Sequence, residues 1–348
     1  MIDVIIPAYN SHSTITRTLS SIAMQLNKDE IKVTIVNDGG NDYKEIVKIF
    51  EPLLDIQEIG YKTNRGPGYA RQYGVDHTKG EFITFIDADD TFYESSSVAI
   101  LAKPLKDTSI KFLITPFVQM GKEIGQQKPM NANLVWVFGH CYRRSFLQEH
   151  NIRFTSTRAN EDVGFNSMCS LIARHEMGDD GAKMLAAATY EWHYNEESIT
   201  RRGKAEYEYG ICTPGYIYNC HYAYKFAQKE GVTLKELARP ALETAFSCFI
   251  YYNVALQQDG LPKETLEAIE ELSRDFYYDY YKQIQDYISR DEYKKAYTDT
   301  MNGKAAHTQG VIFKMTLDQF IELMFSKEPK GVPYEEYEKS VQKIAEAL

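Results

Sequence analysis

The chain has 348 residues, of which 43% are hydrophobic and 25% charged, a balance typical of a soluble globular protein large enough for one or two domains. No run approaches the ~20 apolar residues that span a bilayer, and the first apolar run reaches a polar asparagine by residue 10, so we expect neither a transmembrane segment nor a signal peptide. The net charge of −10 disfavours non-specific binding to nucleic acid, and five scattered cysteines without zinc-ligand spacing indicate reduced thiols and a cytoplasmic protein.

In about the first 200 residues, short apolar runs alternate with segments of helical periodicity. The expected strands are 2–8, 31–36, 55–60, 81–86, 110–118 and 184–188. The expected helices are 15–26, 43–50, 68–78, 92–105 and 163–173. Strands and helices that alternate at these lengths predict an α/β fold in which a mostly parallel sheet is flanked by helices.

The pattern changes after about residue 204, where long tyrosine-rich helical segments follow one another. The expected helices are 205–230, 234–258, 263–290, 316–326 and 333–347. We therefore divide the chain into an α/β domain, 1–203, and a helical C-terminal subdomain, 204–348, which would be an acceptor platform or an oligomer interface. Its tyrosines are expected to pack with their hydroxyls toward solvent, or in part to stack on a sugar or a base.

A cluster of carboxylates follows the strand expected at 81–86. Asp87, Asp89 and Asp90 come directly after this apolar run, with Ala88 between the first two. Carboxylates at the C-terminal end of a strand can bind a hard cation at the sheet edge, which is where open α/β folds bind ligands. An Asp-rich turn without a ligand explains the same residues.

Polar residues also end the first two expected strands. Pro7 fixes the backbone where the first strand ends, and Tyr9 offers a flat ring on which a base could stack. Asp38 is an acceptor suited to the imino N–H of a uracil or to a ribose hydroxyl. The alternative is a turn in which Gly39 and Gly40 supply positive φ.

A glycine-rich basic loop, 64–71, precedes the helix expected at 68–78. It differs from a dinucleotide-binding fingerprint because Arg71 replaces the third small residue. The loop could present Arg65 and Arg71 to a diphosphate near a helix N-terminus. Pairing of these arginines with the carboxylates near residue 87 is equally compatible with the sequence.

Two further candidates lie later in the chain. Asp162 precedes an expected helix, whose N-terminus favours an ionised carboxylate able to accept a proton from a hydroxyl. Helix capping by Asn160, Glu161 and Asp162 is the alternative, and the residues alone favour it. His193 follows an apolar stretch and is either a metal ligand or a structural histidine.

An ordered set of short motifs over about the first 200 residues resembles family 2 glycosyltransferases of the GT-A fold, a Rossmann-like α/β fold. The motifs are Ile6-Pro7-Ala8-Tyr9-Asn10, Asn37-Asp38-Gly39, the 64–71 loop, Asp87-Ala88-Asp89-Asp90, Tyr142-Arg143-Arg144-Ser145-Phe146-Leu147, Ile152-Arg153-Phe154, Glu161-Asp162-Val163-Gly164-Phe165, Trp192-His193-Tyr194 and Ser198-Ile199-Thr200. Asn37 departs from the family pattern, which usually has an aspartate there, and Arg65 and Pro67 are less typical of the loop. The helical remainder carries no resemblance.

The resemblance implies a nucleoside diphosphate sugar donor, with a UDP-sugar favoured, and a divalent cation, Mn²⁺ or Mg²⁺. Asp162 would be the general base, and Asp87, Asp89 and His193 would bind the metal. The implied nucleotide-sugar site comprises Pro7, Tyr9, Asn10, Asp38, Arg65, Gly66, Arg71, Asp87, Ala88 and Glu161.

The expected function is that of an inverting, metal-dependent glycosyltransferase whose hydroxyl acceptor is a glycan or a polysaccharide precursor. One alternative is sugar transfer to a hydroxylated base in DNA, with phosphates bound by Arg143, Arg144, Arg153, Arg158, Arg201, Arg202 and Lys204. Two others are a nucleotidyltransferase that makes a sugar nucleotide and a non-catalytic module that binds one. A homo-oligomer formed through the C-terminal helices is also compatible with the sequence.

Overall fold

The computed structural model describes residues 1–123, 125–195, 209–308 and 310–331, together with Glu336, Lys339 and Val341. The chain forms two compact units. The first comprises Met1–Ser156 and the described residues from Phe165 to Asn195; the second comprises Thr157–Gly164 and the described residues from 209 onward. The expected helix 333–347 lies largely outside the described residues, and Ser198, Ile199, Thr200, Arg201, Arg202 and Lys204 lie wholly outside them.

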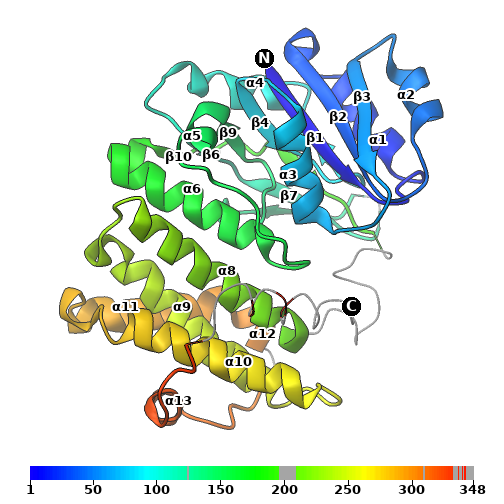
Figure 1. The fold of residues 1–348 in the computed structure, drawn as a ribbon. Coiled ribbons are helices and arrows are strands. Elements are labelled where there is room, and N and C mark those ends of the chain that lie inside the picture. Colours follow the sequence, from blue (N-terminus) through cyan, green and yellow to red (C-terminus); the bar gives the residue numbers. More distant parts are fainter. Residues whose placement is uncertain are drawn as a thin grey trace. The chain divides into compact units, whose positions relative to one another are not determined.

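The first unit is built on a mixed sheet of mostly parallel strands, which confirms the expected α/β class (Figure 1). In spatial order its strands are β10 (Ala182–Met184), β6 (Phe112–Ile114), β9 (Cys141–Arg143), β4 (Phe82–Phe85), β1 (Ile2–Ala8), β2 (Ile31–Asp38) and β3 (Asp55–Tyr61). β9 is antiparallel to both neighbours, β4 and β6. The other neighbouring strands are parallel.

The central strands are mostly apolar because both of their faces are covered. Val4, Ile6, Val33 and Ile35 have no exposed surface. The helices of this unit are α1 (Ile15–Ala23), α2 (Lys44–Phe50), α3 (Pro67–His77), α4 (Ser97–Ala102), α5 (Arg144–Glu149) and most of α6 (Glu161–Met177), with short 3₁₀ turns at Lys28–Glu30, Pro104–Lys106 and Gly178–Asp180. α3 packs on β1 and β2 (Figure 1).

A second, smaller sheet was not expected from the sequence. Its strands, in spatial order, are β5 (Thr91–Phe92), β11 (Tyr190–Trp192), β7 (Phe117–Met120) and β8 (Gln127–Met130). The helix expected at 92–105 is therefore wrong at its start. Tyr190 and Glu191 pair with Phe92 and Thr91, and this contact with a distant segment outweighs the local helical pattern.

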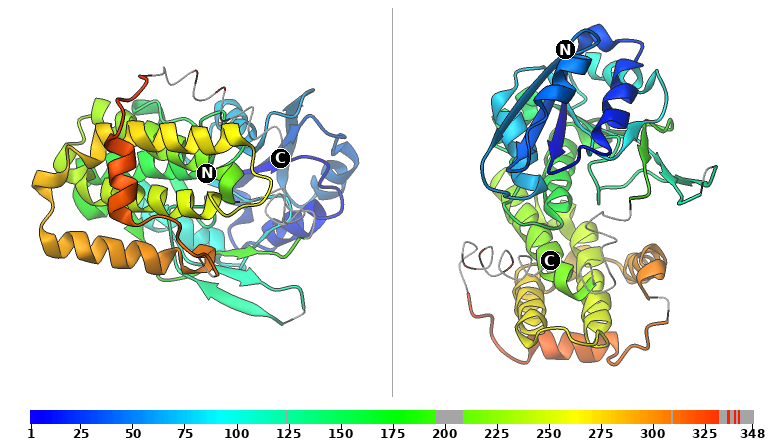
Figure 2. Two further views of the ribbon diagram at one scale, coloured as in Figure 1. Left: turned by 90° about the horizontal axis from the view of Figure 1, so that it is seen from below. Right: turned by 90° about the vertical axis from the view of Figure 1, so that its right-hand side faces the viewer.

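The second unit is helical among the described residues, as expected. Its helices are α8 (Tyr209–Lys229), α9 (Leu234–Ala255), α10 (Lys263–Phe276), α11 (Arg290–Gly303), α12 (Ala305–Thr308) and α13 (Leu317–Phe325). A π-helical turn, Tyr277–Tyr281, follows α10, and a 3₁₀ turn spans Gln285–Tyr287. α13, coloured red-orange in Figure 2, packs against α10.

Three tyrosine hydroxyls of this unit donate inside the protein, which corrects for them the expectation that they reach solvent. The hydroxyl of Tyr277 donates to the carbonyl of Ala245 at 2.9 Å, and that of Tyr280 donates to Gln228 at 2.8 Å. Tyr224 donates to the carbonyl of Pro240. Because these hydroxyls are satisfied internally, the rings can be buried at little polar cost.

All five cysteines are buried free thiols. Among the residues that the structure describes, no helix combines the length and the apolar character that a membrane span requires.

Candidate active site

The ends of three neighbouring strands define the candidate site in the first unit. β4, β1 and β2 are adjacent and parallel, so their carboxyl ends lie at one edge of the sheet. Tyr9 follows β1, Asp38 ends β2, and Asp87 follows β4. The sheet thereby gathers candidate residues that are far apart in the sequence.

Asp38 is buried and holds the glycine-rich loop in place. One of its carboxylate oxygens accepts a hydrogen bond from the backbone N–H of Arg65 at 2.7 Å, and the other accepts from the N–H of Gly66 at 2.9 Å. Gly66 has a φ of 88°, which a side chain would strain. Asp38 thus fixes the turn from which α3 begins.

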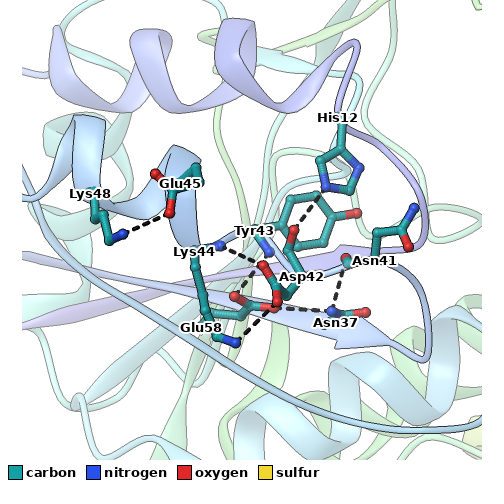
Figure 3. A network of polar contacts seen from close by, with 9 residues as sticks. All are labelled: His12, Asn37, Asn41, Asp42, Tyr43, Lys44, Glu45, Lys48 and Glu58. Carbon is teal, nitrogen blue, oxygen red and sulfur yellow. Dashed lines mark hydrogen bonds and ion pairs between the residues drawn. The ribbon is translucent and has the colours of Figure 1, made fainter.

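Asn37, the residue before Asp38 in β2, holds the turn that follows this strand (Figure 3). Its amide nitrogen donates to the Glu58 carboxylate and to the carbonyl of Asn41, both at 3.0 Å, while its amide oxygen accepts from the N–H of Gly40 at 2.9 Å. The other Glu58 oxygen accepts from the N–H of Tyr43 at 3.0 Å. The Asn37 amide can therefore donate a hydrogen bond to the anionic carboxylate of Glu58.

Tyr9 and Asn10 form the exposed rim beside β1. The side chain of Tyr9 is 49% exposed, which leaves its ring available for stacking. Asn10 has a φ of 52°, and its side-chain oxygen accepts from the N–H of Asn41 at 3.2 Å. Pro7 lies within β1, one residue before its end.

The two arginines of the loop differ in their surroundings. Arg71 is buried and donates to Asp87 at 2.8 Å, so one of the two pairings expected from the sequence is present. The guanidinium of Arg65 lies 3.7 Å above the ring of Tyr69. This cation–π contact restrains an exposed cation at the edge of the site.

The carboxylates of Asp87, Asp89 and Asp90 lie close enough to disfavour one another's ionised forms. Burial raises the pKa of Asp89, and the nearby charge of Asp87 raises it further. The Asp89 carboxylate accepts from the side-chain amide of Asn195 at 2.8 Å, and its backbone carbonyl accepts from Arg17 in α1. Neither Arg17 nor Asn195 was singled out from the sequence.

Asp90 anchors this cluster to β11. Its carboxylate accepts from the hydroxyl of Tyr190 at 2.6 Å and from the N–H of His193 at 2.7 Å. Burial, followed by the charges of Asp89 and Asp87, raises the pKa of Asp90 well above its usual range. The same Tyr190 hydroxyl accepts from the N–H of Asp87 at 3.2 Å. Asp90 therefore organises the loop that presents its neighbours.

The ring of His193 contacts Thr91 and Glu191. Its Nε2 lies 2.7 Å from the Thr91 hydroxyl and 3.3 Å from a Glu191 carboxylate oxygen. Over the described part of the chain, no three His, Cys, Asp or Glu side chains by themselves form a group able to hold a metal. The role of His193 as a ligand stays a prediction.

Glu161 and Asp162 begin α6 and belong to the second unit. Glu161 is buried and Asp162 half-buried. One oxygen of Asp162 accepts from the N–H of Val163 at 2.9 Å, so part of the capping role considered from the sequence is present. The catalytic role of Asp162 stays a prediction.

Two of the seven basic residues considered above for a phosphate-binding patch are buried. Arg143 and Arg144 are buried and donate to backbone carbonyls, and Arg144 also donates to Asp3 at 2.6 Å. Arg153 pairs with Asp76 at 2.6 Å. The guanidinium groups of Arg143 and Arg144 are therefore engaged inside the fold, whereas Arg153 lies in an exposed ion pair.

A family model described as Glycosyl transferase family 2 matches residues 3–168. Residues 3–168 therefore form a domain of glycosyl transferase family 2. The resemblance read from the motifs is therefore confirmed.

Two curated relatives illustrate the range of similarity. The poly(ribitol-phosphate) beta-N-acetylglucosaminyltransferase TarS of Staphylococcus aureus (strain Mu50) is 38% identical over 90 residues, which cover 25% of this chain and 16% of TarS. The uncharacterized glycosyltransferase YibD of Escherichia coli (strain K12) is 28% identical over 226 residues, covering 58% of this chain and 63% of YibD. The chain spans between 16% and 20% of the length of the first curated relatives that it matches.

The crystal structure of S. aureus TarS 1–349 in complex with UDP-GlcNAc has a similar fold, with a TM-score of 0.62 at 18% identity. The match covers 90% of this chain and 93% of that one. It confirms the GT-A fold.

Proposed function

We propose that the chain is an inverting glycosyltransferase that moves a sugar from a UDP-sugar to a hydroxyl of a glycan. The observation that carries this proposal is the meeting of Tyr9, Asp38 and Asp87 at one sheet edge within a family 2 domain. The TarS fragment of similar fold is described in complex with UDP-GlcNAc, which favours UDP-GlcNAc as the first donor to test.

The rim residues suit a nucleoside diphosphate. The exposed Tyr9 ring can stack on a base, with Pro7 and Asn10 shaping the backbone beside it. Asp38, at the end of β2, holds the loop that contains Gly66 and would face the nucleoside, and Arg71 with Asp87 and Ala88 would form the adjoining wall. Arg65 supplies the exposed cation that favours a diphosphate.

The acidic cluster fits a divalent cation, Mn²⁺ or Mg²⁺, because burial and mutual repulsion already raise the pKa of Asp89. Asp87 and Asp89 would hold the ion, and His193 is the further candidate ligand. When bound, such an ion neutralises charge that develops on the departing diphosphate. Asp90 and Tyr190 keep the loop that carries both aspartates in place.

Asp162 is proposed as the general base. Its carboxylate accepts the proton of the acceptor hydroxyl as that oxygen bonds to the anomeric carbon and the bond to the diphosphate breaks. A single displacement of this kind inverts the anomeric configuration. Glu161, buried beside it, is proposed to contribute to the sugar site.

A glycan acceptor is favoured because TarS, by its name, acts on poly(ribitol-phosphate). The DNA alternative is less favoured, since Arg143 and Arg144, two of the seven basic residues considered for it, are buried within the fold. A homo-oligomer and a cytoplasmic location stay predictions.

Release of the nucleoside diphosphate tests the proposal: UDP is measured with UDP-GlcNAc and UDP-glucose, and GDP with GDP-mannose, each with and without poly(ribitol-phosphate). Replacing Asp162 by Asn should lower the transfer rate by roughly 10²- to 10⁴-fold, because the proton acceptor is removed. The affinity for UDP, measured by calorimetry, should change less than about twofold, since Asp162 is assigned to the acceptor side.

Asp180→Asn is the matched control, because Asp180 is an exposed carboxylate outside the proposed site. It should retain the wild-type rate. Equal turnover of Asp162→Asn and wild type would remove Asp162 from the mechanism, and a wild type that releases no UDP from any UDP-sugar would refute the donor class.

A further inference from the structure

The segment that carries Asp162 belongs to the second unit, although its neighbours on both sides along the chain belong to the first. Thr157–Gly164 clusters with the C-terminal helices, and the residues before 157 and after 164 do not. Two hydrogen bonds, from Asn160 to Cys212 and from Asn219 to Thr157, join it to α8. The position of this segment therefore depends on α8.

One side chain of α8 touches both ends of the segment. Asn219 has no exposed surface, and its amide nitrogen donates to the Thr157 hydroxyl at 2.9 Å and to the carbonyl of Gly215 at 2.8 Å. At the other end, a Cβ added to Gly164 would lie 2.8 Å from the side-chain oxygen of Asn219. The asparagine thus occupies the space that the glycine leaves open.

Two contacts fix the middle of the segment to the preceding turn of α8. Asn160 is in the left-handed region with a φ of 61°, and its amide donates to the carbonyl of Cys212 at 3.0 Å. A Cβ added to Gly215 would lie 2.8 Å from the carbonyl oxygen of Ala159. A non-glycine residue with positive φ persists only where its surroundings hold it.

These restraints act directly before the first turn of α6, in which Asp162 lies. Asn160 sets the direction in which the backbone enters this helix, and Asn219 holds the residues on either side of that entry. Buried hydrogen bonds of this kind lose strength steeply when their geometry changes. A displacement of the backbone near 160 would therefore be passed on to the Asp162 carboxylate.

From these contacts we infer that Asn219 is a positioning residue for Asp162, and that α8 forms part of the catalytic apparatus. The inference rests on the role proposed for Asp162 in the preceding section. It gives the helical unit a task in catalysis besides that of an acceptor platform or an oligomer interface. A base displaced by about 1 Å can cost on the order of 10²-fold in rate.

The test compares Asn219→Ala with Asn253→Ala in the full chain. Asn253 is equally buried in the same unit, and its side chain bonds to the carbonyl of Phe249 and the N–H of Met315, outside the segment. Three quantities are measured for each: the melting temperature, the hydrogen exchange of peptides covering 157–164, and kcat and KM for UDP release from UDP-GlcNAc.

Both variants should lower the melting temperature, since each removes a buried amide. Only Asn219→Ala should speed exchange of the 157–164 peptides, by roughly tenfold or more, and lower kcat by roughly 10- to 100-fold with KM within about threefold. Asn253→Ala should leave the segment's exchange and kcat at the wild-type values.

Thr157→Val provides a second variant that keeps the side-chain shape and removes only the hydroxyl acceptor. It should show a smaller effect of the same kind. The double variant with Asn219→Ala should lose little more than Asn219→Ala alone, because both changes break one shared contact. If Asn219→Ala does not fold, Thr157→Val carries the comparison.

The inference is overturned if Asn219→Ala matches Asn253→Ala in segment exchange and in kcat, because the amide would then be only structural. A wild-type protein that releases no UDP refutes UDP-GlcNAc as donor and leaves the exchange comparison intact. In that case unchanged exchange still overturns the inference, and faster exchange confined to Asn219→Ala supports it.

Discussion

His140 shows how one buried side chain makes stability depend on pH. It is 1% exposed, and its Nδ1 lies 3.3 Å from both the hydroxyl of Tyr142 and the side-chain oxygen of Asn166. Burial lowers the pKa of His140 to about 4, so the imidazole is neutral in the folded protein at neutral pH. In the unfolded chain it titrates near its ordinary value of about 6.5.

The free energy of unfolding should therefore fall as the pH drops from about 6.5 toward 4, because over this window the unfolded chain binds a proton that the folded chain does not. At pH 5 the loss that is due to His140 should be about 2 kcal/mol relative to pH 8. Urea unfolding at the two pH values measures it.

His140→Gln isolates this contribution from the carboxylates that titrate in the same range. The variant should be less stable at pH 8 but should lose about 2 kcal/mol less than wild type between pH 8 and pH 5. Parallel pH profiles for wild type and variant would contradict the assignment.

Among individual residues, the sequence predicted the site residues at the ends of strands. It missed the residues that form hydrogen bonds with them. Asp38 and Asp87 were found because each lies at the end of an apolar run, and parallel strands bring such positions together. Arg17, Asn195 and Tyr190 were missed because they reach the site only through folding. Asn37 departs from the family pattern, and its bonding partner, the carboxylate of Glu58, lies in the neighbouring strand β3, 21 residues later in the sequence.

At the scale of elements, Arg274 holds the C-terminal end of α13. It has no exposed surface, and one terminal nitrogen donates to the carbonyls of Leu323 and Met324, each at 2.7 Å, in the last turn of that helix. Its other terminal nitrogen donates to Glu270 at 2.6 Å. The guanidinium thus satisfies carbonyls that a helix end leaves without intrahelical partners.

Arg274→Met should lower the free energy of unfolding by roughly 3–5 kcal/mol, because it leaves buried carbonyls and a partly buried carboxylate without their donor. Hydrogen exchange of peptides covering Leu317–Phe325 should rise more than that of β1. Denaturant unfolding and exchange measure the two effects.

Arg239→Met is the control, since Arg239 is about a third exposed and pairs with Glu243 and Asp299 at the surface of the same unit. Its cost should be at most about 1 kcal/mol. Similar losses for the two arginines would show that the α13 contact contributes little.

Among the elements, the sequence predicted those that a local pattern specifies. The strand expected at 2–8 is β1, because a long apolar run needs no further information. β5 and β9 were not predicted, since they are two and three residues long and pair only with distant segments. β8 was also missed; it is four residues long and pairs with the preceding strand, β7. The single helix expected at 263–290 breaks near Tyr277, where a π-helical turn replaces the regular ladder.

At the scale of the whole molecule, donor binding should stabilise the fold in a metal-dependent way. A ligand present at about 100 times its Kd and bound only by the folded state adds about 2.7 kcal/mol of stability. UDP-GlcNAc with Mn²⁺ should therefore raise the melting temperature by several degrees, and EDTA should remove this increase. Thermal unfolding followed by intrinsic fluorescence measures it.

Asp89→Ala should lose this increase, because Asp89 is proposed to hold the ion. Asp29→Ala, which removes an exposed carboxylate of the same unit, should retain it. An increase that persists in EDTA would show that donor binding does not require the metal.

The assignment of Thr157–Gly164 to the second unit also determines how the protein can be recombined with its relatives. A crossover placed near residue 200, where the sequence changes character, would pair one parent's Thr157 and Gly164 with another parent's α8. Asn219 and Gly215 would then face foreign partners. A functional chimera must therefore take Thr157–Gly164 and the C-terminal helices from the same parent. A single crossover point in the gene cannot achieve this.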